Sequence, residues 1–192
     1  MRRLRDWLER ADVGPALRRF FVNTLFDSTF MLLGIIVGSA FVAEPELEVI
    51  LGTMLSSSFA LGISTGVSVY EAEILEREKR TAEMESALLT DLEDTEVAKS
   101  VKTAAFIISL INFLTPLVAC AISISPFVLS YLGFIEVKAA AWISIATTMG
   151  TLFTAGVYIG RDGKGNAILK GVKMAAFGGI AFLIGYLIEA LI

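Results

Sequence analysis

The sequence predicts an all-α integral membrane protein with five transmembrane helices, and three observations support this fold class. First, 55% of the 192 residues are hydrophobic and the mean hydropathy is +0.72, which is too apolar for an ordinary soluble domain. Second, five apolar stretches are each long enough to cross a hydrocarbon core of about 30 Å. Third, Lys and Arg residues gather in alternate connecting segments, as in multi-pass proteins.

The first half of the chain holds an N-terminal segment and two spans. Residues 1–19 contain six arginines and apolar residues at roughly helical spacing, which predicts a basic amphipathic helix on the inner membrane surface. The Gly14-Pro15 pair is expected to separate this helix from the first span. Transmembrane helices 1 and 2 occupy residues 20–70, at 20–43 and 49–70, with a short acidic turn between them.

The second half begins with a charged segment. Residues 71–100 carry ten acids and follow the second span without a turn signal, so this helix is expected to continue as an acidic cytoplasmic protrusion. Residues 101–192 hold transmembrane helices 3 to 5. The third span is expected at about 103–125 with an interfacial piece after Pro126, the fourth at 137–159 and the fifth at 167–192.

The distribution of basic residues predicts the orientation. Six lie before the first span, five between the second and third, and four around the last turn, while Lys138 is the one left on the other side. The positive-inside rule therefore places the N-terminus in the cytoplasm and the C-terminus outside. No removable signal peptide is visible, and the expected location is the cytoplasmic membrane.

The composition also excludes several kinds of chemistry. The chain has no histidine and a single cysteine, Cys120, which rules out an intrachain disulfide and a Cys/His zinc site. No Gly-rich phosphate loop and no Ser/His/Asp arrangement is present. We expect no enzymatic activity, no permanently bound cofactor and no nucleic-acid partner.

Asp27 lies inside the first apolar stretch. An Asp near the centre of a transmembrane helix costs about 2.5–3.5 kcal/mol, so it is expected to face protein, water or an ion. Met31 follows four residues later on the same helix face, and a carboxylate with a thioether suits a partly dehydrated transition-metal ion. The alternatives are that Asp27 hydrogen-bonds or caps a neighbouring helix and that Met31 fills space.

Two other patterns each allow two interpretations. Glu73 and Glu76 are three residues apart in the protrusion and could share a divalent cation, or they could belong to a solvated charged face. Gly-xxx-Gly pairs in three spans let helix backbones approach closely, either within one subunit or along a homodimer seam on the first helix. These pairs are Gly34 with Gly38, Gly62 with Gly66, and Gly156 with Gly160.

Several segments together resemble the vacuolar iron transporter family. LFDSTFMLLGIIVG resembles its first span, ALGISTGVSVYEAEILERE its second span running into a Glu-rich cytoplasmic helix, and ILKGVKMAAFGGIAFLIGYLIEAL its last span. The resemblance covers nearly the whole chain in the same order. The sequence departs from the family in the second span, where Gly62-Ile63 and Gly66-Val67-Ser68 stand in place of Ser-Met and Gly-Glu-Tyr.

This resemblance implies a homodimer that exports Fe²⁺, and often Mn²⁺, from the cytoplasm in exchange for protons. Asp27 would line a pathway between the subunits, and Glu73, Glu76 and Glu83 would match cytoplasmic metal-gathering glutamates. The predicted metal residues are therefore Asp27, Met31, Glu73, Glu76 and Glu83, and the partners are divalent metal ions, protons, the lipid bilayer and a second copy. A relative without transport activity, acting as a metal-sensing or membrane assembly module, is the alternative.

Overall fold

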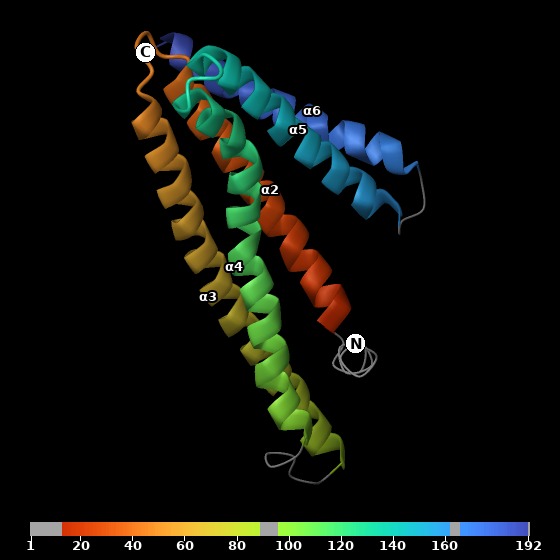
Figure 1. Ribbon diagram of the computed structural model, residues 1–192. Coiled ribbons are helices and arrows are strands. Elements are labelled where there is room, and N and C mark those ends of the chain that lie inside the picture. The colour runs from red at the N-terminus through yellow and green to blue at the C-terminus, as the bar shows by residue number, and fades with distance from the viewer. Residues whose placement is uncertain (1–12, 89–95, 162–165, 192) are drawn as a thin grey trace. The chain divides into compact units, whose positions relative to one another are not determined.

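The computed structural model describes residues 13–88, 96–161 and 166–191, and all regular structure in these ranges is helical (Figure 1). The five helices are α2 (Val13–Ala40), α3 (Leu47–Leu88), α4 (Glu96–Tyr131), α5 (Val137–Arg161) and α6 (Ala167–Leu191). By length and composition each is able to cross a membrane, with apolar segments of 25 to 41 residues. The prediction of an all-α chain with five such helices is therefore confirmed.

Helix α2 begins before the predicted boundary of the first span. The Gly14-Pro15 pair lies in its first turn and does not break the helix. A proline is tolerated there because the first backbone N–H groups of a helix have no intrahelical acceptor. Most of the predicted amphipathic helix at 1–19 lies outside the described residues, which begin at 13.

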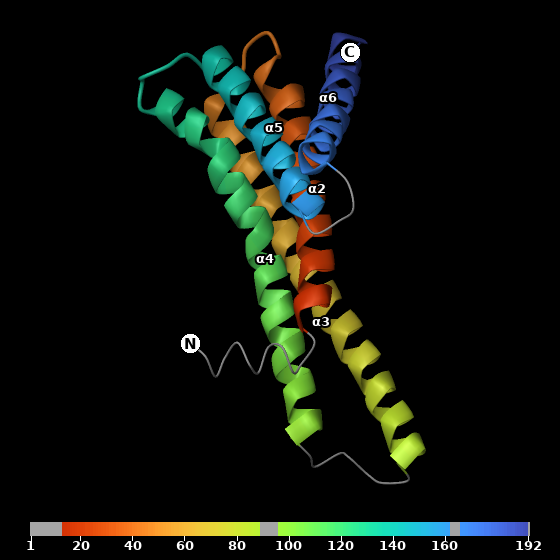
Figure 2. The ribbon, with the colours of Figure 1, turned by 90° about the vertical axis from the view of Figure 1, so that its right-hand side faces the viewer.

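Helix α3 runs for 42 residues, from the second apolar stretch into the charged segment. The expected continuation past Tyr70 is confirmed as far as Leu88. Figure 2 shows the later turns of this helix, in yellow-green, and the first turns of α4, in green, at the lower end of the picture. Residues 89–95 of the predicted protrusion lie outside the described ranges.

Helix α4 differs from the prediction of a span ending near residue 125, because it continues through Pro126 to Tyr131. A proline inside a helix has no N–H to donate to the carbonyl four residues earlier. For Pro126 this carbonyl is that of Ile122. The Ser125 hydroxyl donates to that oxygen at 2.8 Å. This contact satisfies the acceptor, so the helix does not need to end there.

Pro116 has the same effect ten residues earlier, at the carbonyl of Asn112. The Thr65 hydroxyl on α3 lies 3.4 Å from this oxygen, in addition to its bond of 2.9 Å to the carbonyl of Leu61. The acceptor exposed by Pro116 therefore has a protein partner. A cation could coordinate this carbonyl only by displacing the Thr65 hydroxyl.

The end of α4 is a Schellman motif. Phe134 N donates to the carbonyl of Leu129 at 3.1 Å, and Gly133 N donates to that of Ser130 at 2.9 Å. Gly133 has a φ of 80°, in the left-handed region that glycine adopts without a steric penalty. This turn reverses the chain into α5.

The chain divides into two compact units, which are described separately. The first comprises Met1–Thr24 and Leu61–Thr115, and the second Leu25–Ala60 and Pro116–Ile192. In the first unit the start of α2 packs on α3 and α4 around a small apolar core. Its members are Val69, Ala104 and Ile108, with Ala16, Leu17 and Phe20 against them.

The second unit has a larger core formed by α2, α3, α4 and α5, centred on fully buried side chains such as Leu32, Ile50 and Phe127. Polar contacts join α4 to α5 within it. The hydroxyls of Ser123 and Thr148 lie 2.8 Å apart, and Ser144 donates to the carbonyl of Ser123. Hydroxyl groups inside a membrane protein commonly join helices in this way.

Helices α5 and α6 lie side by side and run in opposite directions (Figures 1 and 2). Their contact is made by glycines, because a Cβ placed on Gly156 would lie 2.8 Å from Gly171 Cα. A Cβ on Gly160 would lie 2.6 Å from Ala167 Cα. The backbones are closer than side chains would permit, which is the packing predicted for a Gly-xxx-Gly pair within one chain.

Candidate functional site

Asp27 lies on a face of α2 that the described residues of the second unit leave uncovered. It is exposed, whereas the next two residues, Ser28 and Thr29, are fully buried within the second unit. Asp27 makes no hydrogen bond or ion pair with the described residues. It is also one residue from the centre of the apolar segment Ala16–Ala40, where a bilayer would be least polar.

The same face continues through Met31, Gly34 and Gly38. Met31 is half-buried and packs against the core of the second unit, while both glycines are exposed. A Cβ on either Gly34 or Gly38 would meet no atom within 4 Å. We call these four residues, Asp27, Met31, Gly34 and Gly38, the open face of α2.

The remaining Gly-xxx-Gly pair is closed inside the chain. A Cβ on Gly62 would lie 2.7 Å from the carbonyl oxygen of Phe113, and one on Gly66 would lie 3.1 Å from the Phe113 side chain. Both glycines are buried in the first unit. Of the three predicted pairs, only the one on α2 has no partner among the described residues.

Several hydroxyl residues of α3 bond to the backbone of their own helix. Ser68 donates to the carbonyl of Ser64 at 2.7 Å, and Ser56 donates to that of Gly52 at 2.7 Å. Serine hydroxyls in membrane helices commonly bond to a backbone carbonyl of their own helix in this way. Ser58 is different, because its hydroxyl is buried and makes no hydrogen bond within the described chain.

Ser58 lies in the second unit beside Cys120 of α4. The Cys120 thiol donates to the carbonyl of Met54 at 3.5 Å, and all three side chains are buried. The contact therefore joins α3 to α4 through weak polar groups. It gathers sulfur and hydroxyl groups but no carboxylate.

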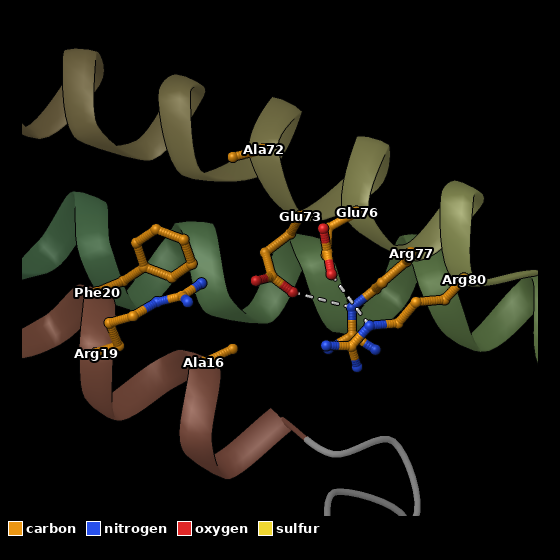
Figure 3. A pocket seen from close by; sticks show the side chains of 8 residues that line it. All are labelled: Ala16, Arg19, Phe20, Ala72, Glu73, Glu76, Arg77 and Arg80. Atoms are coloured by element: carbon orange, nitrogen blue, oxygen red, sulfur yellow. Dashed lines mark hydrogen bonds and ion pairs between the residues drawn. The ribbon is translucent and has the colours of Figure 1, made fainter.

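A second candidate region is a cavity of about 510 Å³ in the first unit, between α2 and α3 (Figure 3). We call it the arginine pocket. Besides two alanines, it is lined by Arg19 and Phe20 of α2 and by Glu73, Glu76, Arg77 and Arg80 of α3. Sequence reasoning missed Arg19 and Phe20 as members of a site, because only the fold brings α2 against this turn of α3.

Two of the three predicted glutamate positions line this pocket, and both are paired with arginines. Arg77 Nε donates to Glu73 Oε2 at 3.0 Å, and Arg80 Nε donates to Glu76 Oε1 at 3.2 Å. The spacing of four residues could have predicted both pairs from the sequence. A metal ion at either carboxylate would have to compete with a guanidinium.

The two ion pairs differ in their exposure. The Glu73 and Arg77 side chains are only 5% and 14% exposed, whereas those of Glu76 and Arg80 are 55% and 60% exposed. Glu83 is exposed on the α3 extension, the part of α3 from residue 71 to 88, and does not line the pocket. Within the described ranges, no three Asp, Glu or Cys side chains are grouped closely enough to hold a metal ion.

No family model matches the sequence. The chain is 27% identical over 179 residues to an uncharacterized protein of Methanocaldococcus jannaschii, and the match covers 92% of this chain and 90% of that protein. The chain is thus similar, over nearly its full length, to an archaeal protein of nearly the same length.

Proposed function

We propose that this chain is one subunit of a homodimeric transporter that exports a divalent metal ion, Fe²⁺ or Mn²⁺, from the cytoplasm in exchange for protons. The observation that carries the proposal is the position of Asp27 on the open face of α2, near the middle of an apolar segment. The resemblance to vacuolar iron transporters supports it. In this proposal the N-terminus is cytoplasmic and the protein lies in the cytoplasmic membrane.

An unpartnered carboxylate at this depth is unfavourable in lipid. The insertion penalty is about 2.5–3.5 kcal/mol for an Asp at the centre of a span, and it is relieved when the group faces protein or an ion. A second copy of α2 would remove Asp27 from lipid. The interface would be isologous, so Asp27 of one copy would face Asp27 of the other across the two-fold axis.

The rest of the open face suits this arrangement. Gly34 and Gly38 carry no side chains and would allow the two helices to approach closely. Two facing carboxylates repel each other unless they share a cation or a proton. A divalent ion and a proton would therefore compete for the same pair of oxygens, which is the requirement for exchange. The Met31 thioether, one turn away, would favour a transition metal over Ca²⁺ or Mg²⁺.

Flux measurement in proteoliposomes tests this function. Under an imposed pH gradient, the wild-type protein is expected to move Fe²⁺ or Mn²⁺, and Asp27→Asn is expected to abolish the flux while leaving folding and dimerisation intact. Glu48→Gln is a matched acid-to-amide control, because Glu48 is exposed in the first turn of α3. No flux of either metal by folded wild-type protein, or equal flux by Asp27→Asn, would contradict the proposal.

One observation favours the alternative, a metal-sensing or membrane assembly module without transport activity. Ile63 and Val67 occupy the positions where the family resembled by this chain has its second-span methionine and glutamate, and they are 57% and 59% exposed. The module would have no polar pathway along α3 at these positions. In that case Asp27→Asn would raise stability, because it removes a charge from the membrane, and would change nothing else.

A further inference from the structure

The arginine pocket lies at the level where the apolar segments give way to charge. On α2 the apolar segment begins at Ala16, so Arg19 and Phe20 belong to its first turns. On α3 the dense charge begins at Glu71, two residues before Glu73. In a bilayer these positions correspond to the headgroup region of one leaflet, on the side of the α3 extension.

The polar lining of the pocket has an excess of positive charge. Three guanidinium groups face two carboxylates, which leaves one net positive charge. Both ion pairs run through the Nε atom of the arginine (Figure 3). The buried pair with Glu73 orients Arg77 beside the cavity, whereas Arg80 is paired with Glu76 at an exposed position. The guanidinium group is planar, always charged and matches the geometry of a phosphate.

Arg19 closes the pocket from the side of α2. Its guanidinium carbon lies 4.9 Å from the centroid of the Phe20 ring, a cation–π contact that orients the side chain. Figure 3 shows Arg19 and Phe20 on the wall opposite Glu73 and Arg77. The cavity is thus bounded by cations from two helices and by one aromatic ring.

We propose that the arginine pocket binds the phosphate group of an anionic phospholipid from the leaflet on this side. Arg19, Arg77 and Arg80 would contact the phosphate, and the Phe20 ring would contact the apolar part of the same lipid. Basic pockets between transmembrane helices bind lipid headgroups by this combination of charge and depth. A free phosphate ion would use the arginines but not the aromatic wall. The inference concerns binding alone and does not depend on metal transport.

The test uses the full-length protein in mixed micelles with equal amounts of phosphatidylglycerol and phosphatidylcholine. After purification, the phospholipid bound per protein is extracted and quantified. The wild type is expected to retain phosphatidylglycerol over phosphatidylcholine, and Arg19→Gln is expected to reduce this preference about fivefold. Arg18→Gln is the matched control, because Arg18 carries the same charge one residue away and does not line the pocket. Its preference should remain within a factor of about two of the wild type.

A second variant and two competitors complete the design. Arg80→Gln removes an exposed pocket arginine and is expected to act in the same direction as Arg19→Gln. Equal losses in Arg18→Gln and Arg19→Gln would overturn the proposal in favour of diffuse surface charge. Displacement of the lipid by millimolar inorganic phosphate would overturn the lipid assignment in favour of a soluble phosphate. Displacement by Mn²⁺ that Glu73→Gln prevents would instead assign the pocket to a metal ion.

Discussion

Two glycine pairs with the same spacing have opposite surroundings within the second unit. Gly156 and Gly160 of α5 are buried against α6, where an added Cβ would come within 2.8 Å and 2.6 Å of backbone Cα atoms. Gly34 and Gly38 of α2 are exposed, and an added Cβ would meet nothing within 4 Å. A Gly-xxx-Gly pair allows two helix backbones to pack closely. Whether the partner helix belongs to the same chain depends on the rest of the fold.

The largest loss of stability is expected when a side chain is placed at the contact between α5 and α6. Gly156→Leu would force a side chain against the backbone of Gly171, which cannot move aside as a flexible side chain would. We expect the unfolding free energy to fall by about 1–3 kcal/mol. The change is measured by thermal or denaturant unfolding in detergent. Gly150→Leu, at an uncovered position on the same helix, is the control. Equal stability of both variants would show that α5 and α6 do not pack through glycine.

A smaller but more specific effect is expected on the open face. Gly34→Leu and Gly38→Leu should leave the stability of the single chain unchanged, because neither position contacts the described chain. Each should weaken dimerisation about tenfold or more, corresponding to about 1.4 kcal/mol. The dimer fraction is measured by light scattering over a range of detergent concentrations. Gly52→Leu, at another uncovered glycine on α3, should not weaken the dimer. The opposite ranking would place the interface elsewhere.

Loss of the hydroxyl contact between α4 and α5 should lower stability less than a substitution of Gly156. Thr148→Val removes the contact of 2.8 Å with Ser123 and is expected to lower stability by about 0.6 kcal/mol, a typical value between membrane helices. Thr154→Val is the control, because Thr154 is exposed and donates only to the carbonyl of Thr151 in its own helix. Unfolding midpoints in the same detergent distinguish them. Equal midpoints would mean that this contact does not hold α4 to α5.

The smallest change in stability is expected at Ser58, whose buried hydroxyl has no hydrogen bond in the described chain. The Ser58 hydroxyl is buried without a hydrogen bond in the described chain, so Ser58→Ala removes a polar atom without removing a bond. The expected change is zero or a stabilisation within about 0.5 kcal/mol. A marked destabilisation in the same unfolding assay would show that the hydroxyl has a partner, such as a bound water molecule.

The number of long apolar helices could be predicted from the sequence because each depends on local composition. The continuation of α3 was also predictable, since no glycine or proline interrupts residues 71–88. The continuation of α4 past Pro126 was not, because it depends on where the Ser125 hydroxyl points. Sequence rules treat the proline as a boundary, whereas the structure supplies a substitute donor.

Only part of the candidate site could be predicted, because some of its features depend on packing between helices. Asp27 is conspicuous in any hydropathy profile, and its depth follows from the limits of the span. Its exposure could not be predicted, because a helix with polar residues at 27, 28 and 29 presents them in three directions. The contribution of Arg19 to the arginine pocket depends on packing between α2 and α3, residues more than 50 positions apart in the chain.

The burial of Cys120 has a practical consequence for chemical labelling. This thiol is the only one in the chain and is 2% exposed, so soluble maleimides and oxidants have no access to it in the folded protein. A reporter cysteine introduced by Gly34→Cys would be the sole reactive thiol without any prior removal of a native one. If two copies meet along α2, oxidation would link them covalently through this position, whereas Gly52→Cys would leave separate chains.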